Sequence, residues 1–291
     1  MRVSCPCQRY RTRPSQVAYV SASVSASVSA SVSARVSASV SASVSASVSA
    51  SVSASVHTGA GTVTAPPLPY KPPVPLPITV VSDIVCPWCL IGHRRLQEAL
   101  ARLPEVETVV DWRPYQLHPY IPREGTSFDE HYRRKFGGNA EMLRARMQQA
   151  GESAGIDFQF DLIERVPNTL AAHTVVGWAE KGEARSAVVE RFFEGYFLEG
   201  QEMGDPEVLA TLASEAGLDR TEVAERLARD DDRELVAAEA DANHRSGITG
   251  VPFFLIGERY PIVGAQSPET MVQVIERVLA MNAEEQGIAP A

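Results

Sequence analysis

The tetrapeptide Cys-Pro-Trp-Cys at residues 86–89 most constrains the fold of this chain, because of what stands on either side of it. The apolar run 78–85 predicts a buried strand, and the amphipathic pattern of residues 87–103 predicts a helix. A strand that leads into C-x-x-C and then into a helix is the setting in which two thiols perform redox chemistry. Pro87 suits the first helical position, where its missing N–H has no partner to lose.

Two intervening residues place both sulfurs in the first helical turn, close enough to form a disulfide. The unpaired N–H groups of a helix N-terminus carry partial positive charge. This charge stabilises a thiolate and lowers its pKa below the ~8.5 of a free cysteine. We therefore predict that Cys86 is the exposed, attacking thiol and that Cys89, one turn further on, is the resolving thiol.

Two structural interpretations of the pair are weaker. A zinc site needs about four ligands, usually with a second close pair. The other cysteines, Cys5 and Cys7, lie in a distant low-complexity segment, and the six histidines have no metal-ligand spacing. A purely structural disulfide would close so short a loop that it would add little constraint. We expect no metal and no bound cofactor.

Charge separates the chain into two parts. The whole chain carries −9 and residues 1–82 carry +6, so residues 83–291 carry −15. An acidic body of this kind argues against a nucleic acid or an anionic membrane surface as partner. No apolar run reaches the length of about eighteen residues that a transmembrane helix requires. The body is long enough to bury a core of its own.

The first 77 residues predict a low-complexity tail. Residues 20–56 repeat Val-Ser-Ala-Ser, whose small side chains bury little surface, so we expect disorder. Residues 66–77 are rich in proline and predict an extended linker. The Arg-rich, acid-free composition is also typical of an organelle transit peptide. We favour a tail without function or a mis-assigned start over that interpretation.

The body alternates between strand and helix patterns. Residues 106–117 predict a second strand, 252–256 with 260–263 a hairpin, and 269–281 a final helix. Between them, helical periodicity covers 127–136, 140–154, 168–180, 184–198, 205–216, 220–229 and 233–245.

The order of these elements predicts an α/β fold. Residues 78–125 supply βαβ and residues 246–285 supply ββα, and together they form one domain. Residues 126–245 form a large all-helical insertion. A strand–helix–strand succession favours a parallel crossover.

This order resembles the thioredoxin fold, and more closely the DsbA family. Residues 82–92 are similar to the FrnE-like branch, which groups with 2-hydroxychromene-2-carboxylate isomerases and kappa-type glutathione transferases. Residues 168–173 and 249–254 carry two further matching segments. The resemblance covers about residues 78–281.

The resemblance implies that Pro252 is a cis-proline that faces the cysteine pair. A cis-proline fixes a sharp loop and has no N–H. The backbone of Val251 is then free to pair with an extended substrate by strand addition. The alternative is an ordinary proline at the start of a strand.

Residues near the pair are weaker candidates. Pro87 and Trp88 occupy the positions between the cysteines that influence the reduction potential. His93 lies one turn past Cys89, where it either tunes a thiolate or, as we favour, is a solvated helix residue.

Three other polar residues have open roles. Asp83 is a candidate for proton transfer, for a pair with Arg94 or for a loop or strand-end role. Asn168 and His173 match a segment that borders the ligand cleft in the isomerase relatives, and helix capping explains Asn168 equally well.

The leading function is a thiol–disulfide oxidoreductase that acts on thiol- or disulfide-containing proteins or peptides, with glutathione as a further candidate co-substrate. One alternative is a glutathione-dependent isomerase or transferase, although those relatives carry serine in place of Cys86. Another is a non-enzymatic holdase that binds unfolded chains. Cysteine usage fits the cytoplasm, and a transit tail would instead place the protein in an organelle.

Overall fold

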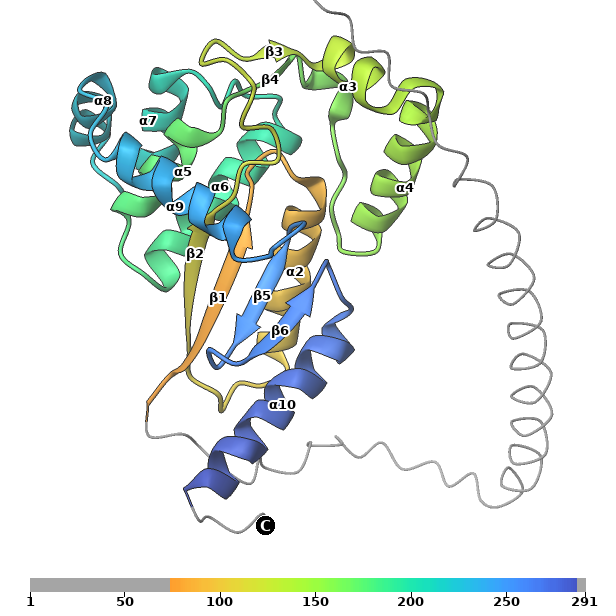
Figure 1. The fold of residues 1–291 in the computed structure, drawn as a ribbon, viewed down its shortest axis with the longest axis vertical. Coiled ribbons are helices and arrows are strands. Elements are labelled where there is room, and N and C mark those ends of the chain that lie inside the picture. Colours follow the sequence, from red (N-terminus) through yellow and green to blue (C-terminus); the bar gives the residue numbers. More distant parts are fainter. Residues whose placement is uncertain (1–73, 287–291) are drawn as a thin grey trace, which may run out of the picture. The chain divides into compact units, whose positions relative to one another are not determined.

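The computed structural model describes residues 74–286, so most of the predicted tail at 1–77 lies outside the described residues. Four strands form one mixed sheet in the order β2-β1-β5-β6 (Figure 1). β1 (Leu76–Ser82) pairs in parallel with β2 (Thr108–Pro114) and antiparallel with β5 (Phe253–Ile256). β6 (Tyr260–Val263) completes the predicted hairpin with β5. The predicted βαβ and ββα units therefore share one sheet.

β1 begins and ends earlier than the sequence predicted. It starts at Leu76, inside the proline-rich segment, where the exposed Pro77 near the strand's start is tolerated. It ends at Ser82 because the next residues turn, and the Asp83 carbonyl accepts the Cys86 N–H at 3.0 Å. This turn delivers Cys86 to the start of α2 (Pro87–Ala101).

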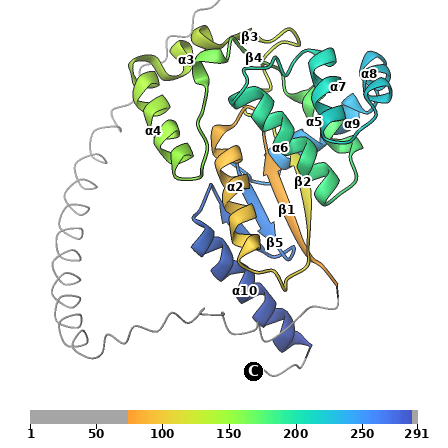
Figure 2. The same ribbon diagram turned by 180° about the vertical axis from the view of Figure 1, so that it is seen from behind.

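Helices cover the sheet on both faces. α2 packs against α10 (Pro268–Glu285), and both lie in front of the sheet in Figure 2. α9 (Arg233–Arg245) lies on the opposite face, where it contacts β2 (Figures 1 and 2). The core between the sheet and α2/α10 consists of fully buried aliphatic and aromatic residues, including Ile78, Leu90, Phe254, Ile256 and Ile275. Each such side chain contributes about 1.5–3 kcal/mol by leaving water.

The segment between β2 and β5 is mainly helical, but it is not wholly helical as predicted. A short antiparallel ribbon joins β3 to β4 and closes one end of the insertion. The ribbon is missed because two-residue strands leave no periodic pattern. The elements in order are β3 (Thr126–Ser127), α3 (Phe128–Phe136), a 3₁₀ turn (Gly137–Asn139), α4 (Ala140–Glu152), a 3₁₀ turn (Phe160–Leu162), β4 (Arg165–Val166), α5 (Leu170–Trp178), α6 (Glu183–Phe197), α7 (Pro206–Glu215), α8 (Arg220–Ala228) and α9.

Side-chain N-caps explain where several of these helices begin. Ser127 accepts the Glu130 N–H at the start of α3, and Asp205 accepts the Glu207 N–H at the start of α7. Each cap satisfies a backbone donor that the helix leaves unpaired. Within residues 74–286, no helix combines the length and apolar character that a membrane span requires.

Candidate active site

Cys86 is the N-cap residue of α2, and Pro87 takes the first helical position as predicted. The Cys89 N–H donates to the Cys86 carbonyl at 2.9 Å, so both cysteines belong to the first turn. Both thiols are free. Cys86 is only 3 % exposed and Cys89 1 %, so the prediction that Cys86 is exposed was wrong. Solvent reaches Cys86 only through a pocket, because neighbouring loops and helices enclose the N-terminus of α2.

The loop before β5 faces the Cys86 thiol. The Val251–Pro252 bond is cis, as the resemblance implied, and the Cys86 thiol donates to the Val251 carbonyl at 3.6 Å. α2 approaches this loop closely at Gly92. A Cβ there would lie 2.9 Å from Pro252 Cγ, so only glycine fits without displacement. Residues about 165 positions apart thus meet at the cysteine pair.

Burial separates the two thiols chemically. Burial raises the pKa of Cys89 well above its ordinary value, and its hydrogen bond with Cys86 raises it further. The nearby charge of Asp83 acts in the same direction. Cys89 is therefore protonated when the pair is reduced. Cys86, at the partially positive helix terminus, is the thiol placed to react.

Asp83 is buried beneath the pair and does not contact Arg94, so that suggested pairing is wrong. Its carboxylate accepts the Leu117 N–H at 2.7 Å and faces His173 Nε2 at 3.3 Å. His173 Nε2 also lies 3.1 Å from the Tyr115 carbonyl. Since both partners of Nε2 are acceptors, this nitrogen carries the hydrogen. Arg94 instead pairs with two glutamates of α6.

A pocket of about 330 Å³ opens beside Cys86 and lies between α2, the loop before β5 and the α3–α4 part of the insertion. It is mainly apolar and aromatic. Its rings and aliphatic side chains include Trp88, Leu117, Phe128, Tyr132, Phe136, Leu143, Met147, Val166, Tyr196 and Phe197. Trp88 is 40 % exposed at the mouth, which places its ring next to any group that reaches Cys86.

Two cations line this apolar pocket. Neither Lys135 nor Arg146 has a carboxylate partner among the described residues. Lys135 Nζ lies 3.3 Å from His118 Nε2. Burial lowers the pKa of Lys135, and the nearby Cys86 and Asp83 oppose this effect. The pocket therefore offers positive charge without a carboxylate partner among the described residues beside the Cys86 sulfur, in a chain whose body is acidic.

Two histidines beside these cations are held neutral. Burial, and then the charge of Lys135, lowers the pKa of His118 to about 4. Burial also lowers the pKa of His131, whose two ring nitrogens have no hydrogen-bond partner. The two rings lie 4.4 Å apart. Protonation here would add charge next to Lys135 in a partly buried environment, so it is disfavoured.

His93 does not lie in this pocket and is not solvated, which corrects the sequence interpretation. It is 3 % exposed, packs edge-on against Trp112 at 5.1 Å and faces Glu190 at 3.5 Å. α6 covers this side of α2, which helical periodicity alone did not reveal.

Asn168 also has a structural position. Its amide donates to the Ile121 carbonyl at 2.7 Å, and its oxygen accepts the Leu170 N–H at the start of α5.

The structure brings together Cys86, Cys89, Trp88 and the Val251–Pro252 loop, with His173 connected through Asp83. Sequence reasoning missed His118, His131, Tyr132 and Lys135. One signal for His118 was available: it follows β2, whose carboxyl end lies beside that of the parallel β1. Within residues 74–286, no group of three or more His, Cys, Asp or Glu is arranged to hold a metal ion.

Known proteins similar to this chain share its sequence pattern or its fold. YwbO of Bacillus subtilis (strain 168), an uncharacterized protein, is 28% identical over 202 residues, which cover 68% of this chain and 94% of YwbO. A probable DsbA oxidoreductase from Streptomyces coelicolor is 27% identical, with a TM-score of 0.61 over 70% of this chain and 90% of that chain. A 2-hydroxychromene-2-carboxylate isomerase shares the fold, with a TM-score of 0.57 and 16% identity over 72% of this chain and 98% of that chain.

A family model described as a DSBA-like thioredoxin domain matches residues 77–276. This span runs from β1 into α10, and it includes both cysteines and the cis-proline. Because the match covers more than half of the sequence, the chain belongs to the family of DSBA-like thioredoxin domains.

Proposed function

We propose that this protein is a thiol–disulfide oxidoreductase that works through Cys86 and Cys89. The observation that carries the proposal is the position of the Cys86 thiol, which caps α2, faces the Val251 carbonyl and lines an apolar pocket. An extended substrate can pair with the backbone at Val251 while its own sulfur approaches Cys86. The apolar walls then hold its neighbouring side chains.

The reaction exchanges one disulfide for another. In the oxidised protein, a substrate thiolate attacks Cys86 Sγ, the Cys86–Cys89 bond breaks, and Cys89 leaves as a thiolate that takes up a proton. A second substrate thiolate then attacks the substrate sulfur of the mixed disulfide and releases Cys86 as a thiolate. The substrate loses two electrons and the cysteine pair gains them. The reverse sequence reduces a substrate disulfide.

The direction is tested by the reduction potential of the full chain, measured by equilibration with glutathione redox buffers and trapping of free thiols. A value near about −120 mV indicates a disulfide donor, and a value near about −270 mV indicates a reductant. If no reversible Cys86–Cys89 disulfide forms at any ratio of reduced to oxidised glutathione, the proposal fails.

Two variants separate the roles of the cysteines. Cys89→Ser should accumulate a mixed disulfide when it is mixed with a disulfide substrate: the Cys86 thiolate attacks one substrate sulfur, the other sulfur leaves as a thiolate, and the resolving thiol is gone. Cys86→Ser should form none under the same conditions. Equal labelling of the two variants would show that Cys86 is not the attacking residue.

Glutathione is the small-molecule thiol that the pocket favours. Glutathione carries two carboxylates, and Lys135 and Arg146 provide two cations without carboxylate partners among the described residues. We expect the oxidised protein to react faster with glutathione than with its diethyl ester, and the difference should shrink in Lys135→Gln. If ester and acid react equally, these cations do not select the substrate, while the thiol exchange itself stands.

A further inference from the structure

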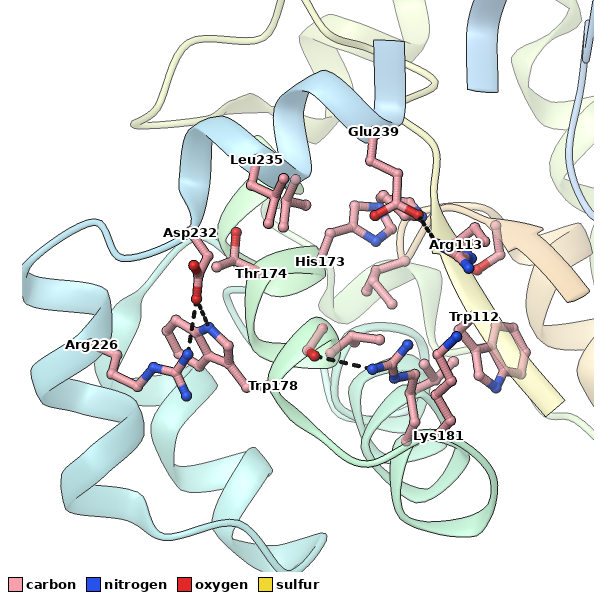
Figure 3. A pocket seen from close by; sticks show the side chains of 18 residues that line it. Trp112, Arg113, His173, Thr174, Trp178, Lys181, Arg226, Asp232, Leu235 and Glu239 are labelled. Atoms are coloured by element: carbon pink, nitrogen blue, oxygen red, sulfur yellow. Dashed lines mark hydrogen bonds and ion pairs between the residues drawn. The ribbon is translucent and has the colours of Figure 1, made fainter. Parts of the chain in front are cut away.

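A second pocket, of about 460 Å³, lies between β2 and helices α5, α6 and α9 (Figure 3). It shares no lining residue with the pocket beside Cys86. Its volume falls in the range of small-molecule sites. His173, whose Nε2 faces Asp83, contributes to its wall from α5. The thiol exchange does not account for this pocket.

Positive charge exceeds negative charge around this pocket. Its lining includes four cationic side chains, Arg113, Lys181, Arg185 and Arg226, and two carboxylates, Asp232 and Glu239. Three of these cations converge on Asp111, which lies behind the wall.

The Asp111 cluster cannot neutralise all of its cations. The Asp111 carboxylate contacts Arg185 at 2.6 Å, Lys181 at 2.8 Å and Arg113 at 2.9 Å. Glu239 compensates one further charge, on Arg113. One positive charge therefore remains in this cluster. Lys181 is 55 % exposed, and Asp111 is the one carboxylate partner it has among the described residues. Its ammonium therefore keeps donors for an added anion.

The opposite side of the pocket carries two large apolar side chains, Trp178 and Leu235, beside the Arg226–Asp232 ion pair. Figure 3 shows Trp178 and Leu235 across the cavity from Arg113 and Lys181. Leu235 is 68 % exposed, which is high for a large apolar side chain. Arg226 stacks over the Trp178 ring at 4.1 Å and pairs with Asp232, so the ring is held in place.

We propose that this pocket binds a small organic acid with an aromatic or branched apolar body. Its anionic group lies against Lys181 and Arg113, where a second anion relieves the excess of cations around Asp111. Its apolar body lies against Trp178 and Leu235 and removes their exposed surface from water. A neutral ligand would leave the charge uncompensated, and an inorganic anion would leave the apolar wall exposed.

The probe is 8-anilinonaphthalene-1-sulfonate, whose fluorescence rises in an apolar site, titrated into the full chain. The neutral analogue N-phenyl-1-naphthylamine serves as the matched ligand without the anion. Saturable binding of the sulfonate is expected, with clearly weaker binding of the amine. Lys181→Gln should lower the affinity for the sulfonate by about fivefold, which is the effect of removing one exposed ion pair.

A pocket-filling variant tests the location without removing a contact. Gly177 lines the pocket, and a Cβ at this position meets no atom within 4 Å. Gly177→Leu should therefore fold. Its affinity for the sulfonate should be lower by about tenfold or more, since the added side chain occupies the site. Gly177→Ala, which adds a single carbon, is the size control.

Lys135→Gln, in the pocket beside Cys86, is the control for the other site, and it should leave the affinity unchanged. Loss of affinity in Lys135→Gln with none in Gly177→Leu would assign the probe to the cysteine pocket and overturn the proposal. Equal affinity for the sulfonate and the amine, or no saturable binding of the sulfonate, would also overturn it. Circular dichroism confirms that each variant is folded.

Discussion

His173 Nε2 lies 3.3 Å from Asp83 Oδ1, and both side chains are buried beneath the turn that carries Cys86. His173 belongs to α5 of the insertion, and Asp83 follows β1 of the sheet. The contact therefore connects the helical insertion to the turn that carries Cys86 through a carboxylate. The Leu117 N–H donates to the other carboxylate oxygen, which fixes the orientation of Asp83.

Asp83→Asn should lower the pKa of Cys89. The negative charge of Asp83 disfavours a second negative charge on the Cys89 sulfur and raises its pKa, whereas an Asn oxygen still accepts the Leu117 N–H. The measurement is the pH dependence of alkylation of Cys89 in a Cys86→Ser background, with and without Asp83→Asn. Asp161→Asn, at a carboxylate that is 94 % exposed, is the control. An unchanged alkylation profile would contradict the assigned role of Asp83.

Gly92→Ala should destabilise the protein. The new Cβ would lie 2.9 Å from Pro252 Cγ and 3.0 Å from Phe254 Cζ, and such overpacking costs about 1–3 kcal/mol. The better helix propensity of alanine offsets about 1 kcal/mol of this. We expect a net loss of about 1 kcal/mol in the free energy of unfolding, measured by urea denaturation.

Gly177→Ala is the matched control for that substitution. Its Cβ meets no atom within 4 Å, and the residue lies in α5. The change should stabilise the protein by about 0.5–1 kcal/mol, the helix-propensity gain alone. If both glycine variants shift the free energy of unfolding in the same direction, close packing against Pro252 does not explain why glycine occupies position 92.

Lys135→Gln should raise the pKa of His118 above its value of about 4. Burial is the larger cause of the lowered pKa, and it remains in the variant. The substitution therefore reverses only the part of the lowering that is due to the Lys135 charge. A proton NMR titration of the imidazole measures this shift. Arg133→Gln, which removes a charge from an exposed position of the same helix, should leave His118 unchanged. An equal shift in both variants would indicate a general charge effect rather than the Lys135 contact.

Glu190 should make the protein sensitive to acid. The His93 imidazole, 3.5 Å away, and then the charge of Arg94 lower the pKa of Glu190 to about 2, although burial opposes this. A carboxyl group with a pKa below its unfolded value of about 4.3 stabilises the fold above that pH. This stabilisation disappears as the pH falls towards about 2. Because the side chain is 26 % exposed, solvent screening reduces the contribution to roughly 1 kcal/mol.

Urea denaturation of Glu190→Gln tests this contribution. The variant should be less stable than the parent by roughly 1 kcal/mol at neutral pH, and the difference should narrow as the pH approaches 3. Glu225→Gln, at a side chain that is 67 % exposed, should change little at either pH. A constant difference between Glu190→Gln and the parent across this range would show that the loss is not linked to ionisation.

The order and the approximate bounds of the main strands and helices were predictable because each depends on a local pattern. The period of apolar residues, the caps at Ser127 and Asp205, and proline at the start of α2 each act within a few residues. The interpretation of His93 failed for the same reason. Periodicity places a residue on a helix face, but it does not say that α6 will cover that face and bury His93 against Trp112.

The sequence by itself determined the cysteine pair and its position at a helix start. Spacing sets how two thiols meet within one turn, so these two features need no knowledge of the rest of the chain. The proline that faces the pair was expected only from the resemblance to a known family, because Val251 lies 165 positions from Cys86. Tertiary structure decided the remainder: the aromatic pocket with Lys135, the contact of His173 with Asp83 and the second pocket around Lys181. These sites join residues far apart in the chain, such as His173 and Asp83, which are 90 positions apart. Their meeting depends on how whole helices pack, which local sequence does not specify.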